Sequence, residues 1–123
     1  MYNEKVIEVF KNPKNMGDLE GANAIGTVGN VTCGDIMQMS LIIEEDIIKD
    51  AKFKTFGCVA AIAASSMATE MIIGKSINEA MQIKNSDVVD ALGGLPPQKI
   101  HCSVLAEESI HEAIKNYKEK HIK

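Results

Sequence analysis

The sequence predicts an α+β fold in which a three-stranded antiparallel sheet packs against a set of helices. Apolar residues alternate with period 2 between residues 36 and 56, whereas helical spacing prevails after residue 59. Strands followed by helices favour α+β over a parallel α/β sheet, in which the two alternate. The 123 residues, 46% of them hydrophobic, suffice for one core and not for two, so we expect a single domain spanning residues 1–123.

Three strands are expected in the first half of the chain. A loop over residues 12–23, rich in Asn, Gly and Asp, leads to a short first strand at 24–28. The second strand, at 36–44, shows the period-2 alternation of a strand with one buried face, and the third, at 47–56, alternates again. The polar residues 44–46 suit a turn, so these two strands should form an antiparallel hairpin.

Helices are expected both before and after these strands in the sequence. Asn3 can cap the first one, and Ser76 and Glu79 stand in the capping-box relation before a later one. A run of small residues after Gly57 suits a helix that packs closely on a sheet and stops at Gly74. The predicted helices cover residues 3–10, residues 59–73, a short segment after Ser76, a segment from Asp87 to Gly93, and residues 103–117. Residues 95–99 should be extended or turned, because Pro96 and Pro97 restrict the backbone there.

Composition and charge argue against nucleic acids and membranes as partners. The formal net charge is -4 with a pI near 5.3, and Lys and Arg are not gathered into a block. No apolar run approaches the ~20 residues that span a bilayer, and the first residues lack the apolar core of a signal peptide. We therefore expect a cytoplasmic protein.

The three cysteines are the most informative residues, and their odd number and the expected reducing compartment indicate thiols rather than disulfides. Each is expected at a junction between elements. The junctions are Cys33-Gly34-Asp35 between the first two strands, Gly57-Cys58 where the third strand becomes a helix, and His101-Cys102 where the Pro-rich turn becomes the last helix. A single buried Cys is usually a plain packing residue, so it is the joint pattern that indicates a site.

The positions of these cysteines favour metal or sulfur chemistry. Cys58 and Cys102 are expected at helix N-termini, where unpaired N–H groups favour the thiolate, and Lys99 adds positive charge nearby. Gly34 and Gly57 leave room for a bound group. Three thiolates with one oxygen or nitrogen ligand suit either an iron–sulfur cluster or zinc, and the residues do not separate these two.

A series of longer segments extends the pattern over nearly the whole chain. They are residues 12–13 (Asn-Pro), 33–35 (Cys-Gly-Asp), 54–58 (Lys-Thr-Phe-Gly-Cys), 74–76 (Gly-Lys-Ser), 83–85 (Ile-Lys-Asn) and 95–107, which contains Leu-Pro-Pro-Gln-Lys-Ile-His-Cys. In this order and at this spacing, the sequence resembles the IscU-type iron–sulfur cluster assembly scaffolds, which are related to the N-terminal domain of NifU.

The resemblance implies a scaffold and not an enzyme. Such a protein accepts sulfur from a cysteine desulfurase as a persulfide, takes iron and electrons from an iron donor or a ferredoxin, builds a transient [2Fe–2S] cluster and passes it to apo-proteins. On family analogy the ligands are Cys33, Cys58 and Cys102, with Asp35 or His101 completing the set, and Lys99 tunes the site. The resemblance is also compatible with Zn²⁺ in the apo scaffold and with a homodimer around one cluster.

Two departures from the family pattern and three other readings accompany this prediction. Gln98 replaces the apolar fourth residue of the family's Leu-Pro-Pro-Val-Lys segment, which predicts weak binding to an Hsp70-type chaperone, and the C-terminal domains of full-length NifU are missing. The first alternative is a zinc-bound sulfur acceptor of the SufU type, although this chain lacks the insertion that such proteins carry before the last cysteine. The second is a thiol enzyme that uses Cys58 or Cys102 as nucleophile, with His101 as base and Asp35 as orienter. The third is a purely structural module.

Overall fold

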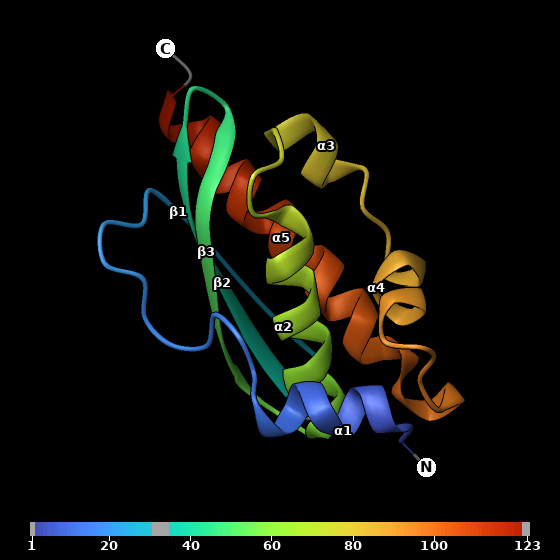
Figure 1. Cartoon of the computed structure of the whole chain (residues 1–123). Coiled ribbons are helices and arrows are strands. Elements are labelled where there is room, and N and C mark those ends of the chain that lie inside the picture. Colours follow the sequence, from blue (N-terminus) through green and yellow to red (C-terminus); the bar gives the residue numbers. More distant parts are fainter. Residues whose placement is uncertain (1, 31–34, 122–123) are drawn as a thin grey trace.

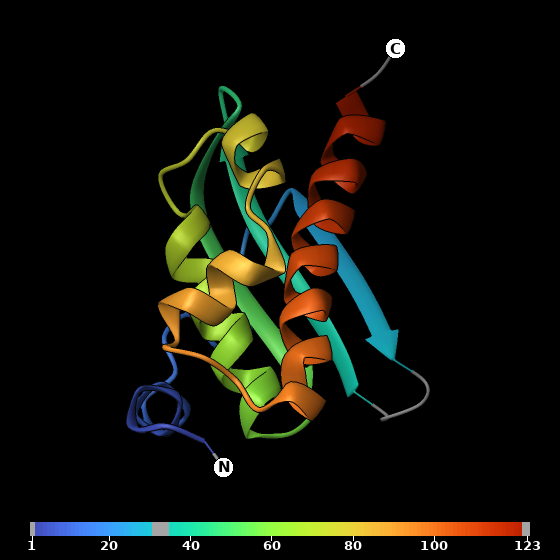
Figure 2. The ribbon, with the colours of Figure 1, turned by 90° about the vertical axis from the view of Figure 1, so that its right-hand side faces the viewer.

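The computed structural model describes residues 2–30 and 35–121, and it has the predicted α+β architecture. One three-stranded antiparallel sheet is covered on one face by helices (Figures 1 and 2). The elements in chain order are α1 (Glu4–Lys11), β1 (Ala24–Asn30), β2 (Asp35–Glu44), β3 (Ile47–Phe56), α2 (Val59–Ile72), α3 (Ile77–Met81), α4 (Asn85–Ala91), the 3₁₀ helix η1 (Pro97–Lys99) and α5 (Ile100–His121).

The sheet has the order β1-β2-β3, and alternate residues of its central strand point into the core. The buried side chains of β2 are Met37, Met39, Leu41 and Ile43, as the period-2 pattern predicts. The pairing between β2 and β3 shifts after Ile42, which faces Asp50, so that Ile43 faces Ile48 and Lys49 is left over as a bulge. The bulge resets the alternation of β3, so that Ala51 and Phe53 also point inward.

The long helices α2 and α5 lie across the core face of the sheet (Figure 2). Half of the residues of α2 are Ala or Ser, and the helix is buried on most sides, because the sheet, α1 and α5 all pack against it. α5 approaches β1 even more closely. A Cβ at Gly26 would lie 2.7 Å from the backbone carbon of Glu112 and 2.8 Å from the carbonyl oxygen of Ser109, so only glycine fits this contact.

The outer strand edges are covered by other parts of the chain. Gly17 donates its backbone N–H to the Phe53 carbonyl, and Phe53 donates to the Asn15 carbonyl, both at 2.8 Å, so the loop before β1 pairs briefly with β3. At the other edge, the backbone N–H of Ile25 donates to the side chain of Asn116 on α5 at 3.1 Å. These contacts occupy groups that would otherwise be open to pairing with another chain.

Two helix starts differ from the prediction. The last helix begins at Ile100 instead of residue 103, because η1 starts at Pro97 and runs directly into it. α4 begins at Asn85 and not at Asp87, whose carboxylate instead accepts a hydrogen bond of 2.9 Å from the backbone N–H of Lys84. The predicted capping box before α3 is confirmed.

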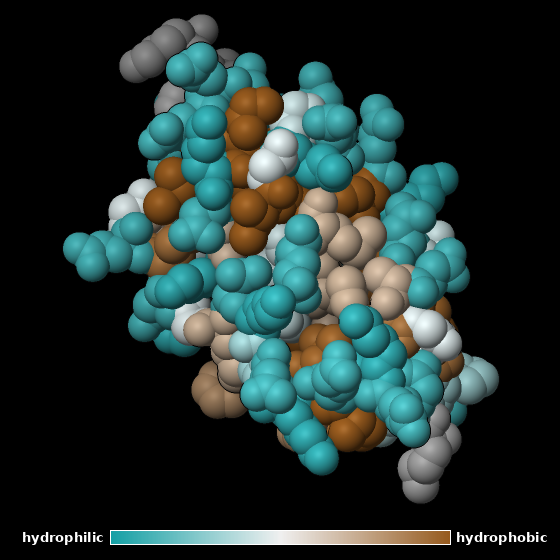
Figure 3. Space-filling view, viewed as in Figure 1, coloured by the Kyte–Doolittle hydropathy of each residue, from teal (hydrophilic) through white to brown (hydrophobic). Residues whose placement is uncertain are grey.

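The molecular surface is mostly hydrophilic in the view of Figure 3, with apolar patches between the polar side chains. Within the described residues, no helix combines the length and apolar character needed to cross a membrane.

Candidate functional site

The predicted site lies at one end of the molecule, where the end of β3, the start of α2 and the start of α5 come together (Figures 1 and 2). Cys58 follows β3 by two residues and is the N-cap of α2, with extended backbone angles. This confirms the predicted junction. The N-terminal segment before α1 reaches the same end of the molecule.

The structure brings two of the cysteines and one histidine together. The sulfur atoms of Cys58 and Cys102 are 3.7 Å apart, and both thiols are reduced. The sulfur of Cys102 lies 3.5 Å from Nε2 of His101. The predicted convergence of these three residues on one site is therefore present in the fold.

These separations suit a shared metal. With metal–sulfur bonds of ~2.3 Å and a metal–nitrogen bond of ~2.0 Å, a tetrahedral metal holds two sulfurs ~3.8 Å apart and a sulfur and a nitrogen ~3.5 Å apart. The two measured distances agree with these edges. In residues 2–30 and 35–121, however, no group of three or more His, Cys, Asp and Glu side chains is positioned to hold a metal ion. Cys58, Cys102 and His101 therefore do not by themselves form a three-ligand metal site in this part of the chain.

The start of α2 favours the thiolate form of Cys58. Burial by itself raises the pKa of this thiol. The backbone N–H groups of Ala61 and Ala60, a hydrogen bond with the Cys102 thiol and the positive charge of Lys99 together outweigh burial, and the pKa falls below its ordinary value. The N–H groups act on the sulfur without making a side-chain capping hydrogen bond of ordinary geometry.

Cys102 has a different environment from the one predicted. It lies inside the first turn of α5 and not before it, and its side chain is 0% exposed, whereas Cys58 and His101 are only partly buried. Lys99 is the last residue of η1, one turn before Cys102, and its charge acts on Cys58. Because Cys102 is enclosed by the core, the open side of the thiol pair is that of Cys58.

The remaining predicted residues are only partly described. Cys33 and Gly34 lie outside the described residues. Asp35 is the first residue of β2 and pairs with Asn30, instead of lying in the turn, because the β1–β2 ladder continues to this point. Its neighbour Ile36 pairs with Phe56, so the backbone of Asp35 is at the same end of the sheet as Cys58. Gly57 is exposed beside Cys58.

Tyr2 is a site residue that the sequence reasoning missed. Its phenol group lies near the sulfur of Cys58, and burial, the negative charge of Cys58 and the interaction with this sulfur raise the pKa of the phenol despite the opposing charge of Lys99. The contact joins residues that are 56 positions apart. No local sequence pattern could have predicted this contact.

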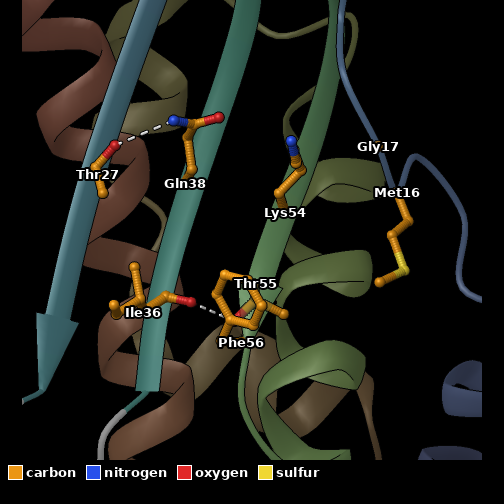
Figure 4. Close-up of a pocket in the computed structure, with 8 residues that line it drawn as sticks. All are labelled: Met16, Gly17, Thr27, Ile36, Gln38, Lys54, Thr55 and Phe56. Atoms are coloured by element: carbon orange, nitrogen blue, oxygen red, sulfur yellow. Dashed lines mark hydrogen bonds between the residues drawn. The ribbon is translucent and has the colours of Figure 1, made fainter.

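A depression of about 430 Å³ lies on the open face of the sheet (Figure 4). Apolar side chains of Met16, Ile36 and Phe56 line it, and Lys54 at its wall pairs with Asp18 at 2.9 Å. It contains no thiol or imidazole, so it does not suit a soft metal. Phe56 is 79% exposed and lies two residues before Cys58 in the chain.

The fold and this constellation of thiols agree with comparisons to known proteins. The model of the NifU-like N terminal domain matches residues 1–123, and the chain belongs to this family, whose members include the IscU-type proteins.

Several relatives are similar over most of their length. The chain is 53% identical over 117 residues to "Iron-sulfur cluster assembly scaffold protein IscU 1" of Archaeoglobus fulgidus, covering 95% of this chain and 76% of that protein. It is 49% identical over 123 residues to "Iron-sulfur cluster assembly scaffold protein IscU" of Escherichia coli, covering 97% and 95%. A crystal structure of a putative scaffold protein for the SUF system from Fervidobacterium islandicum matches with a TM-score of 0.77 at 25% identity, covering 92% and 96%.

Proposed function

We propose that this protein is an iron–sulfur cluster assembly scaffold and that the cluster, its cargo, is built at the Cys58–Cys102 pair. The structural support is the approach of Cys58, Cys102 and His101 to one another, with separations of 3.7 Å between the sulfurs and 3.5 Å between the Cys102 sulfur and Nε2 of His101 that are close to those between two ligands of one metal. Membership of the family and the names of its relatives support the same function. The cargo we propose is a [2Fe–2S] cluster.

In this proposal the ligands are Cys33, Cys58 and Cys102, with Asp35 or His101 completing the set. The contact between His101 and the sulfur of Cys102 supports imidazole as a ligand, while the position of Asp35 at the same end of the sheet supports a carboxylate. A carboxylate oxygen is a harder and weaker partner for cluster iron than thiolate. A ligand set that includes it therefore suits a cluster that must leave.

We propose a cysteine desulfurase as the source of sulfur. A scaffold thiolate attacks the outer sulfur of the donor's persulfide, the donor cysteine leaves as a thiolate, and the scaffold keeps the sulfane sulfur. Each sulfane sulfur then needs two electrons to become sulfide, so an electron source such as a ferredoxin and an iron donor belong to the proposal. The lowered pKa of Cys58 favours the attacking thiolate form.

The apolar surface around Phe56 is the part of the molecule that we assign to contact with the sulfur donor. Phe56 is largely exposed and lies two residues before Cys58 in the chain, so a protein that delivers sulfur to Cys58 can also contact it. Apo-proteins that receive the cluster would approach from the same side. The exposed Gln98 supports weak binding to an Hsp70-type chaperone. We also propose a cytoplasmic location, because that compartment keeps thiols reduced.

The deciding experiment is anaerobic reconstitution with iron, sulfide and a thiol reductant, followed by metal analysis and a visible spectrum. A charge-transfer spectrum with two irons per cluster supports the proposal. Alanine variants of Cys33, Cys58 and Cys102 should each lose the bound cluster. A folded parent protein that binds no iron under these conditions refutes it.

The second candidate is a zinc-bound sulfur acceptor of the SufU type. The donor separations fit Zn²⁺ as well as iron, and a SUF-system protein is among the structural relatives. A colourless protein that holds one zinc per chain and accepts sulfur without a cluster would favour this function. A thiol enzyme is disfavoured, because the sulfur that contacts His101 belongs to the buried Cys102 and not to the more accessible Cys58.

A further inference from the structure

The side chain of Asn3 joins two distant parts of the chain beside the thiol site. Its Oδ1 accepts a hydrogen bond of 2.9 Å from the backbone N–H of Val6 and caps α1. Its Nδ2 donates to the carbonyls of Leu92 at 3.1 Å and Gly94 at 3.2 Å, just after α4. One amide group thus fixes the start of α1 to the segment that leads into η1.

The receiving segment is shaped to hold this amide. Gly93 lies between the two accepting carbonyls with φ of +78°, a conformation that favours glycine. A Cβ at Gly93 would lie 3.3 Å from Nδ2 of Asn3, so the amide packs directly against this turn. The fit between Asn3 and the turn is therefore specific in both hydrogen bonding and shape.

Tyr2 precedes Asn3 and extends the same segment over the thiols. Its side chain packs against the core, and its phenol group lies near enough to the sulfur of Cys58 to interact with it. Because Cys102 is enclosed by the core, Cys58 is the accessible member of the pair. Tyr2 therefore lies beside the accessible thiol.

We propose that residues 2–3 form a strap over the open side of the Cys58–Cys102 pair and that the Asn3 amide fastens it to Leu92 and Gly94. When the Asn3 hydrogen bonds are made, the strap limits the size of the molecules that reach Cys58. When they are broken, the thiol becomes accessible to a large partner. The purpose of the strap, admission of sulfur or metal, rests on the proposed function, whereas its presence is measured on the metal-free protein without any cluster.

The test compares two maleimides, N-ethylmaleimide and a maleimide attached to a polyethylene glycol chain. Both react with the thiolate, so the ratio of their rates at one cysteine reports access and cancels changes in pKa. Peptide mapping by mass spectrometry assigns the reaction to Cys58.

Asn3→Asp is the informative variant. Aspartate keeps an oxygen to cap α1 but removes both N–H donors and places a carboxylate against two carbonyls. The ratio of large to small reagent at Cys58 should rise about ten-fold, as expected for the loss of two hydrogen bonds that hold the closed form. Tyr2→Ala, which removes the covering ring, should raise the ratio similarly.

Asn15→Asp is the matched control, since it removes the donor of a 3.1 Å hydrogen bond to Thr69, about three turns along α2 from Cys58. Its ratio should equal that of the parent. An unchanged ratio in folded Asn3→Asp and Tyr2→Ala, or an equal rise in Asn15→Asp, overturns the strap. Failure of reconstitution in the parent would instead refute the proposed function and leave this result standing.

Discussion

Replacing Gly26 with alanine should destabilise the protein more than any ordinary surface substitution, because β1 lies against the backbone of α5 at this point. The added methyl group would clash with the backbone nitrogen of Ala113 and lie 2.7 Å and 2.8 Å from backbone atoms of Glu112 and Ser109. Comfortable contacts between such atoms are about 3.5–4.0 Å, so strand and helix must separate by roughly 1 Å. Backbone atoms of a regular helix cannot rotate away as a side chain can.

Overpacking of a core costs typically about 1–3 kcal/mol, and the rigidity of both elements places Gly26→Ala at about 3 kcal/mol or above. For a chain of this size, that lowers the melting temperature by roughly 10 °C. Urea unfolding followed by circular dichroism measures the change, and Thr27→Ala on the exposed face of the same strand serves as control, with a loss below about 1 kcal/mol. A Gly26→Ala variant as stable as the Thr27→Ala control would show that β1 and α5 are not in close contact.

Four further predictions concern the site. The iodoacetamide reaction of Cys58 in the metal-free protein should have its pH midpoint below that of the same thiol in the urea-unfolded chain, and Lys99→Met should move it upward. Asp35→Ala should permit cluster assembly yet slow the loss of the visible band when the cluster passes to an apo-ferredoxin. Gln98→Val should strengthen binding to an Hsp70-type chaperone, measured by calorimetry. Phe56→Ser should weaken binding to a cysteine desulfurase about ten-fold or more in the same assay, with the alkylation rate of Cys58 unchanged.

Each of these has an outcome that contradicts it. A thiol at Cys58 with an ordinary pH midpoint would remove the role of the α2 N-terminus. Equal transfer rates for Asp35→Ala and the parent would make Asp35 a structural residue. Tight chaperone binding by the parent would show that Gln98 is tolerated, and unchanged desulfurase affinity in Phe56→Ser would place the donor elsewhere.

The thiol of Cys58 also contributes to the pH dependence of stability. Because its pKa is lower in the folded protein than in the unfolded chain, the thiolate stabilises the fold. This contribution is fully present above the pKa of the unfolded chain and is lost as the pH falls through the lowered pKa of the folded protein. Cys58→Ser should remove this part of the pH dependence while leaving the rest of the curve in place.

Much of the fold was predictable because it depends on local pattern. The alternation in β2 follows from one buried face, and the cap of α1 by Asn3 and the capping box before α3 depend on residues three positions apart. The predicted start of α5 at residue 103 is wrong, because Pro96 and Pro97 do not keep the following residues out of a helix. Pro97 instead occupies the first position of η1, where its missing N–H costs nothing.

The site was predictable only in part. The junction positions of Cys58 and Cys102 follow from the elements around them, but their 3.7 Å separation depends on how α2 and α5 pack. The contacts of Tyr2 with Cys58 and of Asn3 with Leu92 join parts of the chain that share no local pattern. Such contacts depend on the tertiary structure, and the periodicity of apolar residues in the sequence does not predict them.

The unequal burial of the two thiols determines which of them an incoming group reaches first. Cys102 is fixed inside the first turn of α5 and fully enclosed, so it cannot move without disturbing the core. Cys58 caps α2 at the surface, where its backbone is extended and its side chain is partly open. An incoming sulfur or iron atom must therefore first meet Cys58 and the segment that lies over it, while Cys102 and His101 form the fixed inner wall against which the bound group is held.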